Sequence, residues 1–504
     1  MKTAILAPSI AQSSSAPSAK RPASQWRLVG VIARKEITEM LRDSRLLWAG
    51  AIVVCLLGVA MLLGWQQAQR TLAERMSARN LTYSQWLEQG EKNPHSAAHF
   101  GQYAFKTTSP LAFLDPGVDP YAGVTVWMEA HKQNEFKYRP ARDATSLQRF
   151  GALSVAFVLQ TMAPLLIILL GFAAFTGERE RGTLRQLLSV GVRPAHLLLG
   201  KLVSLSAWVL VLLVPVGLGG LWLMLTSSNP STPTSSSFTH SGVQLGLMLA
   251  GYAAYLVGFC ALVLAVSAAL KSSRQALIVL LAFWVVNSFV APRVLTDFAR
   301  HLSPNPTAVE FQNRLASERK ATFGHDEKHP AFIAFRDRIL KQHNVLKVAD
   351  LPADFRGFAL REDDENGYRI FDNNYGELWG TYLHQERIRS ALGWAFPLLA
   401  MQPLSLGLAG TDTAHHIEFA RAAEAYRRQI QTMVSDELMT NVKPGDKQYV
   451  ANRKLWERLP SFTETQPALS WELAQQWPNG LFLLFWCGGT LLFAGWMTRR
   501  LRPV

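Results

Sequence analysis

Six long runs of apolar residues decide what this chain of 504 residues can fold into. A helix needs about 20 residues to cross the roughly 30 Å hydrocarbon core of a bilayer, because each residue advances it by about 1.5 Å. None of the six runs contains Asp, Glu, Lys or Arg, and a charge at the centre of such a helix costs at least about 2.5 kcal/mol on insertion. The sequence therefore predicts an all-α polytopic membrane protein with transmembrane helices over 46–65, 152–175, 202–225, 243–270, 276–292 and 479–498.

The positive charges collect in segments that six crossings would place on one side of the membrane. Lys and Arg far outnumber Asp and Glu in residues 1–45, 176–201, 271–275 and 499–504, which hold nearly all of the net charge of +14. Because Lys and Arg in short flanking loops mark the cytoplasmic side, both termini are predicted to be cytoplasmic, in a bacterial inner membrane. Contact of these loops with membrane lipid explains the basic balance without nucleic acid as a partner.

The segments between the spans predict the remaining organisation. Residues 1–24, rich in Ser, Ala and Pro, predict a disordered cytoplasmic tail, and 25–45 an amphipathic elbow helix. The long polar segments 66–151 and 293–478 predict two mainly helical extracytoplasmic insertions, because unpaired loops do not cross hydrocarbon. Residues 226–242 predict a short extracytoplasmic loop.

Three segments of the larger insertion have recognisable patterns. Residues 331–347 and 412–438 are rich in helix formers, with acidic residues early and basic residues spaced i to i+4, so both predict helices. Residues 391–410 form a seventh apolar stretch that contains Pro397 and Pro403. If this stretch crossed the membrane, the arginines at the C-terminus would lie outside. We therefore predict a re-entrant or interfacial helix on the outer side.

The fourth run contains small residues at every fourth position, which stack on one face of a helix. They are Gly246, Ala250, Ala254 and Gly258. Small residues at this spacing allow a second helix to approach closely. Packing against another span of the same chain is favoured over an interface between subunits.

The sequence lacks the common signatures of catalysis. Gly200-Lys201 has no glycine at the spacing of a phosphate-binding loop, so no nucleotide site is expected in this chain. His325 and His329 have the i to i+4 spacing of metal ligands on a helix. The glycine and proline that bracket them favour a solvated turn, so they are only a weak candidate for a metal site and no resident metal is expected.

Two segments of the predicted cytoplasmic side are suited to bind a partner. The elbow has Trp26, Val29, Ala33, Ile37 and Leu41 at helical spacing, which predicts a helix lying in the membrane interface, with a plain topogenic anchor as the alternative. In the loop between the second and third runs, Leu184, Leu187 and Leu188 form a short apolar face beside charged residues. Thr183 is a candidate cap. A short helix of this kind fits a groove of a partner protein.

The order of these elements resembles the ABC-2 type transporter permeases. The resemblance rests on Arg34-Lys35-Glu36 and Arg42-Asp43 before the first run, and on Glu-Arg-Glu-Arg-Gly-Thr-Leu at 178–184 after the second. It implies half of a dimeric membrane unit, built with a second copy or a sibling permease, whose coupling helix docks on a separate ATPase that holds ATP and Mg. Carried over, the residues facing the ATPase would be Glu178, Glu180, Gly182, Thr183, Leu184, Leu187 and Leu188.

The resemblance favours a non-catalytic permease subunit of an ATP-driven exporter. The predicted spans carry no ionisable residue that could couple transport to an ion gradient, so the energy is expected to come from the ATPase. The alternative is a membrane scaffold or sensor that binds a ligand or a periplasmic protein through its insertions. A membrane-embedded enzyme is disfavoured because no nucleophile, metal triad or buried carboxylate pair is recognisable.

Overall fold

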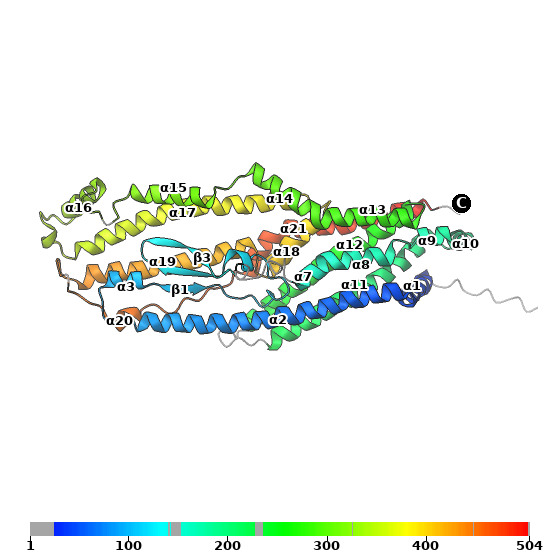
Figure 1. Ribbon diagram of the computed structural model, residues 1–504, viewed down its shortest axis with the longest axis horizontal. Coiled ribbons are helices and arrows are strands. Elements are labelled where there is room, and N and C mark those ends of the chain that lie inside the picture. The colour runs from blue at the N-terminus through cyan, green and yellow to red at the C-terminus, as the bar shows by residue number, and fades with distance from the viewer. Residues whose placement is uncertain are drawn as a thin grey trace, which may run out of the picture.

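The computed structural model is an elongated bundle of helices that run along its long axis (Figure 1). It describes residues 25–139, 142, 153–226, 235–324, 326–446 and 448–501. The predicted tail 1–24 and His325 lie outside the described residues. One end carries α1 (Gln25–Arg42), α9 (Thr176–Glu180), α10 (Thr183–Ser189) and the C-terminus, and we call it the elbow end. The opposite end carries the two large insertions, and we call it the insertion end.

Six helices of the described chain are long and apolar enough to cross a membrane, as the sequence predicts. They extend beyond the predicted runs, because a helix continues past the point where its residues become polar. The extension is longest after the first run, where residues 66–87 contain neither Gly nor Pro. The six candidate spans are Ser44–Leu87, Val155–Glu180, Pro194–Leu225, Thr239–Ala269, Ser273–Leu302 and Leu469–Arg499.

Four of these spans lie in single helices and two are interrupted by a wide turn. The single helices are α2 (Ser44–Leu87), α11 (Pro194–Thr226), α12 (Ser235–Ala269) and α21 (Leu469–Arg499). Helix α12 begins four residues before its candidate span. The second span is built from α7 (Val155–Phe157), η1 (Val158–Met162) and α8 (Ala163–Gly171), and continues to α9. The fifth is built from α13 (Ser273–Val285), η2 (Val286–Val290) and α14 (Ala291–Leu302). Both η1 and η2 are π-helical turns.

A proline explains each π-helical turn. Pro164 and Pro292 stand at the start of the helix that follows the turn. A proline lacks the N–H of a helix bond and its ring crowds the carbonyl four residues earlier, which a wider turn relieves. The neighbouring helices supply donors for the exposed carbonyls: the Tyr255 hydroxyl donates to the Gln160 carbonyl at 2.8 Å, and the Trp284 indole to the Thr161 carbonyl at 2.9 Å.

Helix α12 is the centre of the membrane bundle. It packs along α21 and also contacts α11 and α8. The small residues spaced four apart on this helix have different surroundings at its two ends. At Gly258 an added Cβ would lie 2.2 Å from the Trp486 indole nitrogen of α21, so α12 and α21 pack closely at this position. Gly246 and Ala250 are exposed, and an added Cβ at Gly246 meets nothing within 4 Å.

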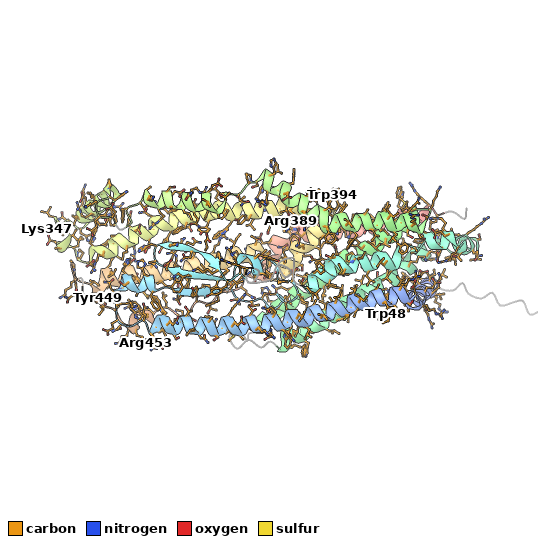
Figure 2. The ribbon with its side chains drawn as sticks, in the orientation of Figure 1. Trp48, Lys347, Arg389, Trp394, Tyr449 and Arg453 are labelled. Carbon is orange, nitrogen blue, oxygen red and sulfur yellow. The ribbon has the colours of Figure 1, made fainter. Side chains whose placement is uncertain are left out.

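Several exposed tryptophans lie at different levels along the bundle. Trp48 lies near the elbow end and Trp394 halfway along the molecule (Figure 2). On α21, Trp477 and Trp496 are 62% and 48% exposed and stand 19 residues apart, which is about 28 Å along a helix and close to the thickness of a hydrocarbon core. Tryptophan is enriched at both membrane–water interfaces, and the spacing of these two tryptophans on α21 matches that enrichment.

The smaller insertion contains a sheet that the prediction of a mainly helical domain missed. Strands β1 (Gln102–Phe105), β2 (Thr125–Glu129) and β3 (Lys132–Lys137) form an antiparallel sheet in the order β1-β2-β3. Strand β1 contacts α2, and β2 contacts α19 (Thr413–Asn441). The inward positions of these strands bury side chains on those helices. The same insertion contains α3 (Pro94–Phe100) and α4 (Asp119–Ala122).

The larger insertion is helical, as predicted. Its main body is the pair of long helices α17 (Phe355–Ser390) and α19, which pack on each other. The predicted helices 331–347 and 412–438 correspond to α16 (Pro330–Gln342) and α19. The side chain of His329 accepts a hydrogen bond from the Ala331 N–H at 3.2 Å and so caps α16. The other elements are α15 (Ala308–Lys320), η3 (Val348–Asp350) and α20 (Arg453–Trp456).

The apolar stretch 391–410 contains a short buried helix, α18 (Leu398–Leu408), which packs against α12 and α21. Asn287 accepts a hydrogen bond from the Leu398 N–H at 3.2 Å. The Ser405 hydroxyl donates to Asp115 at 2.6 Å and lies 3.0 Å from the Tyr252 hydroxyl. A helix lying on the membrane surface would leave one side free of protein contacts. The burial of α18 therefore favours the re-entrant alternative.

Candidate functional site

Three segments from distant parts of the sequence meet at the elbow end. Helix α1 packs along the first turns of α11, and α9 lies beside both. An added Cβ at Gly200 would lie 2.5 Å from Ile32, so glycine is what allows α1 and α11 to approach this closely. The next residue along α11 is Lys201, which points into the junction of the three segments.

Lys201 is the centre of a buried network of charges. Its side chain is only 2% exposed, and its Nζ lies 2.7 Å from Glu36 Oε1 on α1 and 2.9 Å from Glu178 Oε1 on α9. Lys35 contacts the same two carboxylates from the solvent side, at 3.0 Å and 3.2 Å. The Phe175 ring covers Lys201, with its centroid 5.4 Å from Nζ. Two cations and two carboxylates thus link α1, α9 and α11.

The network favours the charged forms of Glu36 and Lys35. Burial disfavours the charge of Glu36, but Lys201 and Lys35 outweigh burial and hold the pKa of Glu36 below its usual range. Burial also disfavours the charge of Lys35, yet Glu36 and Glu178 raise the pKa of Lys35 above its ordinary value. A buried ion that loses its partner is costly, whereas a paired one is tolerated. The four groups therefore favour one relative position of the three segments.

The loop with α9 and α10 is also fixed to the junction of α12 and α13. Arg179 donates to the carbonyls of Ala268, at 3.1 Å, and Leu270. Glu180 accepts from the Ser273 N–H at 2.7 Å and from its hydroxyl at 2.8 Å, at the first residue of α13. One short loop thus holds the ends of the second, third, fourth and fifth candidate spans and of α1.

The residues predicted to face an ATPase differ in their exposure in this chain. Glu178 and Leu184 are 2% and 4% exposed and point into the chain. Leu187 and Leu188 are half-buried and pack against the core of the bundle. The apolar face of α10 is directed toward the protein's own helices. The leucine spacing alone does not predict this, since an apolar face of this width fits either a partner's groove or the end of the bundle.

The other predicted residues have varied positions. Glu180 caps α13, and Gly182 has a φ of 76°, which allows the chain to turn between α9 and α10. The Thr183 hydroxyl donates to the Glu178 carbonyl rather than capping α10. On the elbow, Arg34 and Arg42 are exposed, whereas Asp43 accepts from the Arg45 N–H and begins α2.

A groove of about 540 Å³ lies on the outer surface of this site, between α1 and α10. Both walls carry charged or amide groups, and the floor is partly apolar. Val190, at the end of α10, is 77% exposed beside it. The lining residues are Lys35, Glu39, Glu178, Arg181, Thr183, Gln186, Leu187 and Val190.

Lys201 is the functional residue that sequence reasoning missed. In the sequence, Lys201 is one of several basic residues of the loop, and Gly200-Lys201 lacks the glycine spacing of a phosphate-binding loop. The available signal was a lysine directly before an uncharged run, with acidic residues in two other segments on the same predicted side. Those signals do not specify which charges meet, since Glu36 lies 165 residues away.

The six candidate spans, the elbow helix and the short loop bonded to several spans together form a polytopic helical membrane protein. Residues 130–299 match the family model described as ABC-2 family transporter protein. This match covers about a third of the chain, with the second to fourth candidate spans and most of the fifth, and it supports the resemblance to ABC-2 type permeases seen in the sequence. Residues 308–464, in the larger insertion, match a family described as a domain of unknown function (DUF3526). No curated protein matches the chain.

Proposed function

We propose that this chain is the permease subunit of an ATP-driven exporter in a bacterial inner membrane, with the elbow end in the cytoplasm. Two permeases and separate ATPase subunits would form the complete transporter. The observation that carries the proposal is the buried network of Lys201, Glu36 and Glu178, together with the bonds of Glu180 to Ser273. A partner that moves this loop would move α1 and four spans together.

The groove between α1 and α10 is the proposed docking site for the ATPase. The exposed side chains around it are Arg181, Arg185, Gln186 and Val190. ATP-driven movement of the ATPase would press on this surface, and the ion network would transmit the displacement as a rigid-body shift of the spans. This mechanism requires no catalytic group in the permease, and ATP and Mg would be bound by the partner.

Substitutions on the exposed rim test the docking site. Arg185→Glu combined with Val190→Asp reverses one charge and places another in an apolar contact, while both positions are exposed and leave the interior intact. We expect loss of co-purification with the proposed ATPase subunit, and loss of the ATP turnover that the permease would stimulate. The matched control is Val309→Asp, at a valine of α15 that is 69% exposed. Assembly and turnover equal to the control would disprove the docking assignment.

A further inference from the structure

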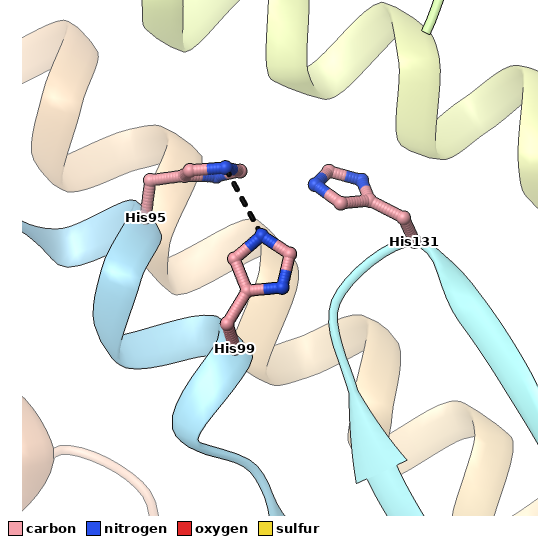
Figure 3. Close-up of side chains that lie close together, drawn as sticks. All are labelled: His95, His99 and His131. Atoms are coloured by element: carbon pink, nitrogen blue, oxygen red, sulfur yellow. Dashed lines mark hydrogen bonds between the residues drawn. The ribbon is translucent and has the colours of Figure 1, made fainter. Parts of the chain in front are cut away.

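Three imidazole rings converge at the insertion end. His95 and His99 lie one turn apart on α3, and His131 reaches them from the turn between β2 and β3 (Figure 3). The Nε2 atoms of His95 and His99 are 3.2 Å apart. The ring centroid of His131 is 5.2 Å from each of the other two. One ring nitrogen from each of the three lies within 4.8 Å of the others.

These distances suit a transition-metal ion. Zinc binds imidazole nitrogen at about 2.0–2.1 Å, so two ligands of a tetrahedral site are about 3.3–3.4 Å apart. The His95–His99 pair is already at that separation, and rotation of the His131 side chain brings the third nitrogen inward. Imidazole is a ligand for Zn, Ni and Cu, whereas Ca and Mg prefer oxygen. Three histidines leave a fourth position for water or another ligand.

The surroundings of His131 resemble the outer shell of a metal site. Its Nδ1 lies 3.4 Å from Asp363 and 3.3 Å from Asp364, two carboxylates of α17 that are 2% and 5% exposed. Arg319 contacts Asp363 at 3.1 Å and holds it in place. Metal-ligating histidines usually direct their second nitrogen at a carboxylate or carbonyl, which fixes the ring and makes it a stronger ligand. This arrangement leaves Nε2 as the ligating atom of His131.

The backbone around the three histidines is also specific. His131 has a φ of 60°, a left-handed conformation that is uncommon for a residue with a side chain and that clusters at functional sites. The Ala130 N–H donates to the Ala98 carbonyl at 3.2 Å, which joins the hairpin turn to α3. Asn93 caps α3 at the His95 N–H. His99 is exposed, so the site has an entry path from solvent.

We propose that His95, His99 and His131 bind one divalent transition-metal ion, of which Zn²⁺ is the best fit, in the insertion domain. The ion would join α3, the β2–β3 turn and, through the two aspartates, α17. Binding to the folded state alone would stabilise this domain in proportion to the free metal concentration. The site concerns the insertion end and is independent of the docking of an ATPase at the elbow end.

The test is metal binding by the purified full chain after chelator treatment, with Zn²⁺ as the probe. Calorimetry is expected to give one ion per chain, and Co²⁺ is expected to give the visible absorption of a tetrahedral site. His99→Ala, which alters an exposed side chain, should weaken Zn²⁺ binding at least about 10-fold, as losses around metal sites commonly do. The matched control is His384→Ala, an exposed histidine of α17, which should bind as the wild type does.

Two further variants keep the test decisive. Asp364→Asn should weaken Zn²⁺ binding while leaving one ion per chain, because it alters the outer shell. His95→Gln should abolish the Co²⁺ absorption, with circular dichroism confirming that the fold is intact. Wild-type protein that binds no Zn²⁺ above the level of the His95→Gln, His99→Ala double variant would overturn the proposal, as would an unchanged affinity of His99→Ala.

Discussion

Lys201 shows how one side chain can hold several segments in place. A lysine that is 2% exposed must have partners, and Glu36 and Glu178 supply them from two other segments. Lys35 contacts the same carboxylates but is 44% exposed, so water screens its contribution. The two lysines have similar partners in different surroundings, and their substitution should have different effects.

Replacing Lys201 by Met should destabilise the protein by about 3–5 kcal/mol, because it leaves two buried carboxylates without their main partner. The matched change, Lys35→Met, should cost at most about 1 kcal/mol. Thermal unfolding of both variants in the same detergent measures the difference. Equal losses of stability would contradict the assignment of Lys201 as the central member of the network.

His415, at the start of α19, makes the stability of the protein depend on pH. Burial disfavours its charged form, but Asp412 at 2.6 Å and Glu472 at 3.6 Å outweigh burial and raise the pKa of His415 to about 9. Because the folded-state pKa lies above the unfolded value of about 6.5, the stabilisation is fully present below pH 6.5 and is lost as pH rises through 9. Glu464, which also faces this histidine, has a pKa raised to about 7 by burial.

Comparing the wild type with His415→Gln at each pH separates the contribution of His415 to stability from that of Glu464, because Glu464 is present in both proteins. The variant should be less stable than the wild type at pH 6, and the difference should shrink as the pH rises through 9. Thermal unfolding between pH 6 and 10 measures both proteins. A difference that stays constant over this range would show that the charge of His415 does not contribute.

At the scale of elements, the two interrupted spans follow one rule. Each has a polar residue in a π-helical turn, Gln160 or Asn287, and a proline just after it. The sequence shows both prolines and both polar residues. It does not show which neighbour satisfies the carbonyls, since that depends on the packing of α12 and α13 against α8.

Removing one such neighbour should weaken the second span. Tyr255→Phe deletes the hydroxyl that donates to the Gln160 carbonyl at 2.8 Å, while keeping the ring. An unsatisfied buried carbonyl costs about 1–3 kcal/mol, and the Tyr255→Phe variant should lose stability by that amount. The control is Tyr121→Phe, at a tyrosine that is 52% exposed. Thermal unfolding of both variants tests the role of the hydroxyl.

Two glycines of α12, Gly258 and Gly246, offer a second matched pair of substitutions. Gly258→Leu places a side chain against Trp486 and should cost about 1–3 kcal/mol or more through overpacking. Gly246→Leu points into open space and should be tolerated within about 0.5 kcal/mol. The identical substitution at two positions of one helix separates packing from helix propensity. A large loss at Gly246 would instead place this position at an interface with another chain, such as the second permease proposed above.

For the whole molecule, the sequence predicts the membrane spans, which depend on the contrast between water and lipid. It does not predict which side chains from distant segments come into contact. The six spans follow from the absence of charge over 20 residues, which the bilayer itself requires. The buried side of α10 could not be distinguished from its exposed side, because Leu184, Leu187 and Leu188 fit either a partner or the bundle. The histidine group was missed because His131 lies more than 30 residues from His95 and His99, and only the β2–β3 turn brings them together.

Helix α2 has a mechanical consequence for the molecule. It runs without interruption from Ser44, just after the elbow, to Leu87 beside α20, a length of about 65 Å. At its far end the Trp86 indole donates to the Trp456 carbonyl at 3.0 Å. A rigid rod of about 65 Å converts a tilt of about 5° into a lateral movement of about 6 Å at its tip. A small rotation of α2 near the elbow would therefore displace its far end sideways by slightly more than the rise of one helical turn. No hinge between the two ends of the helix is needed.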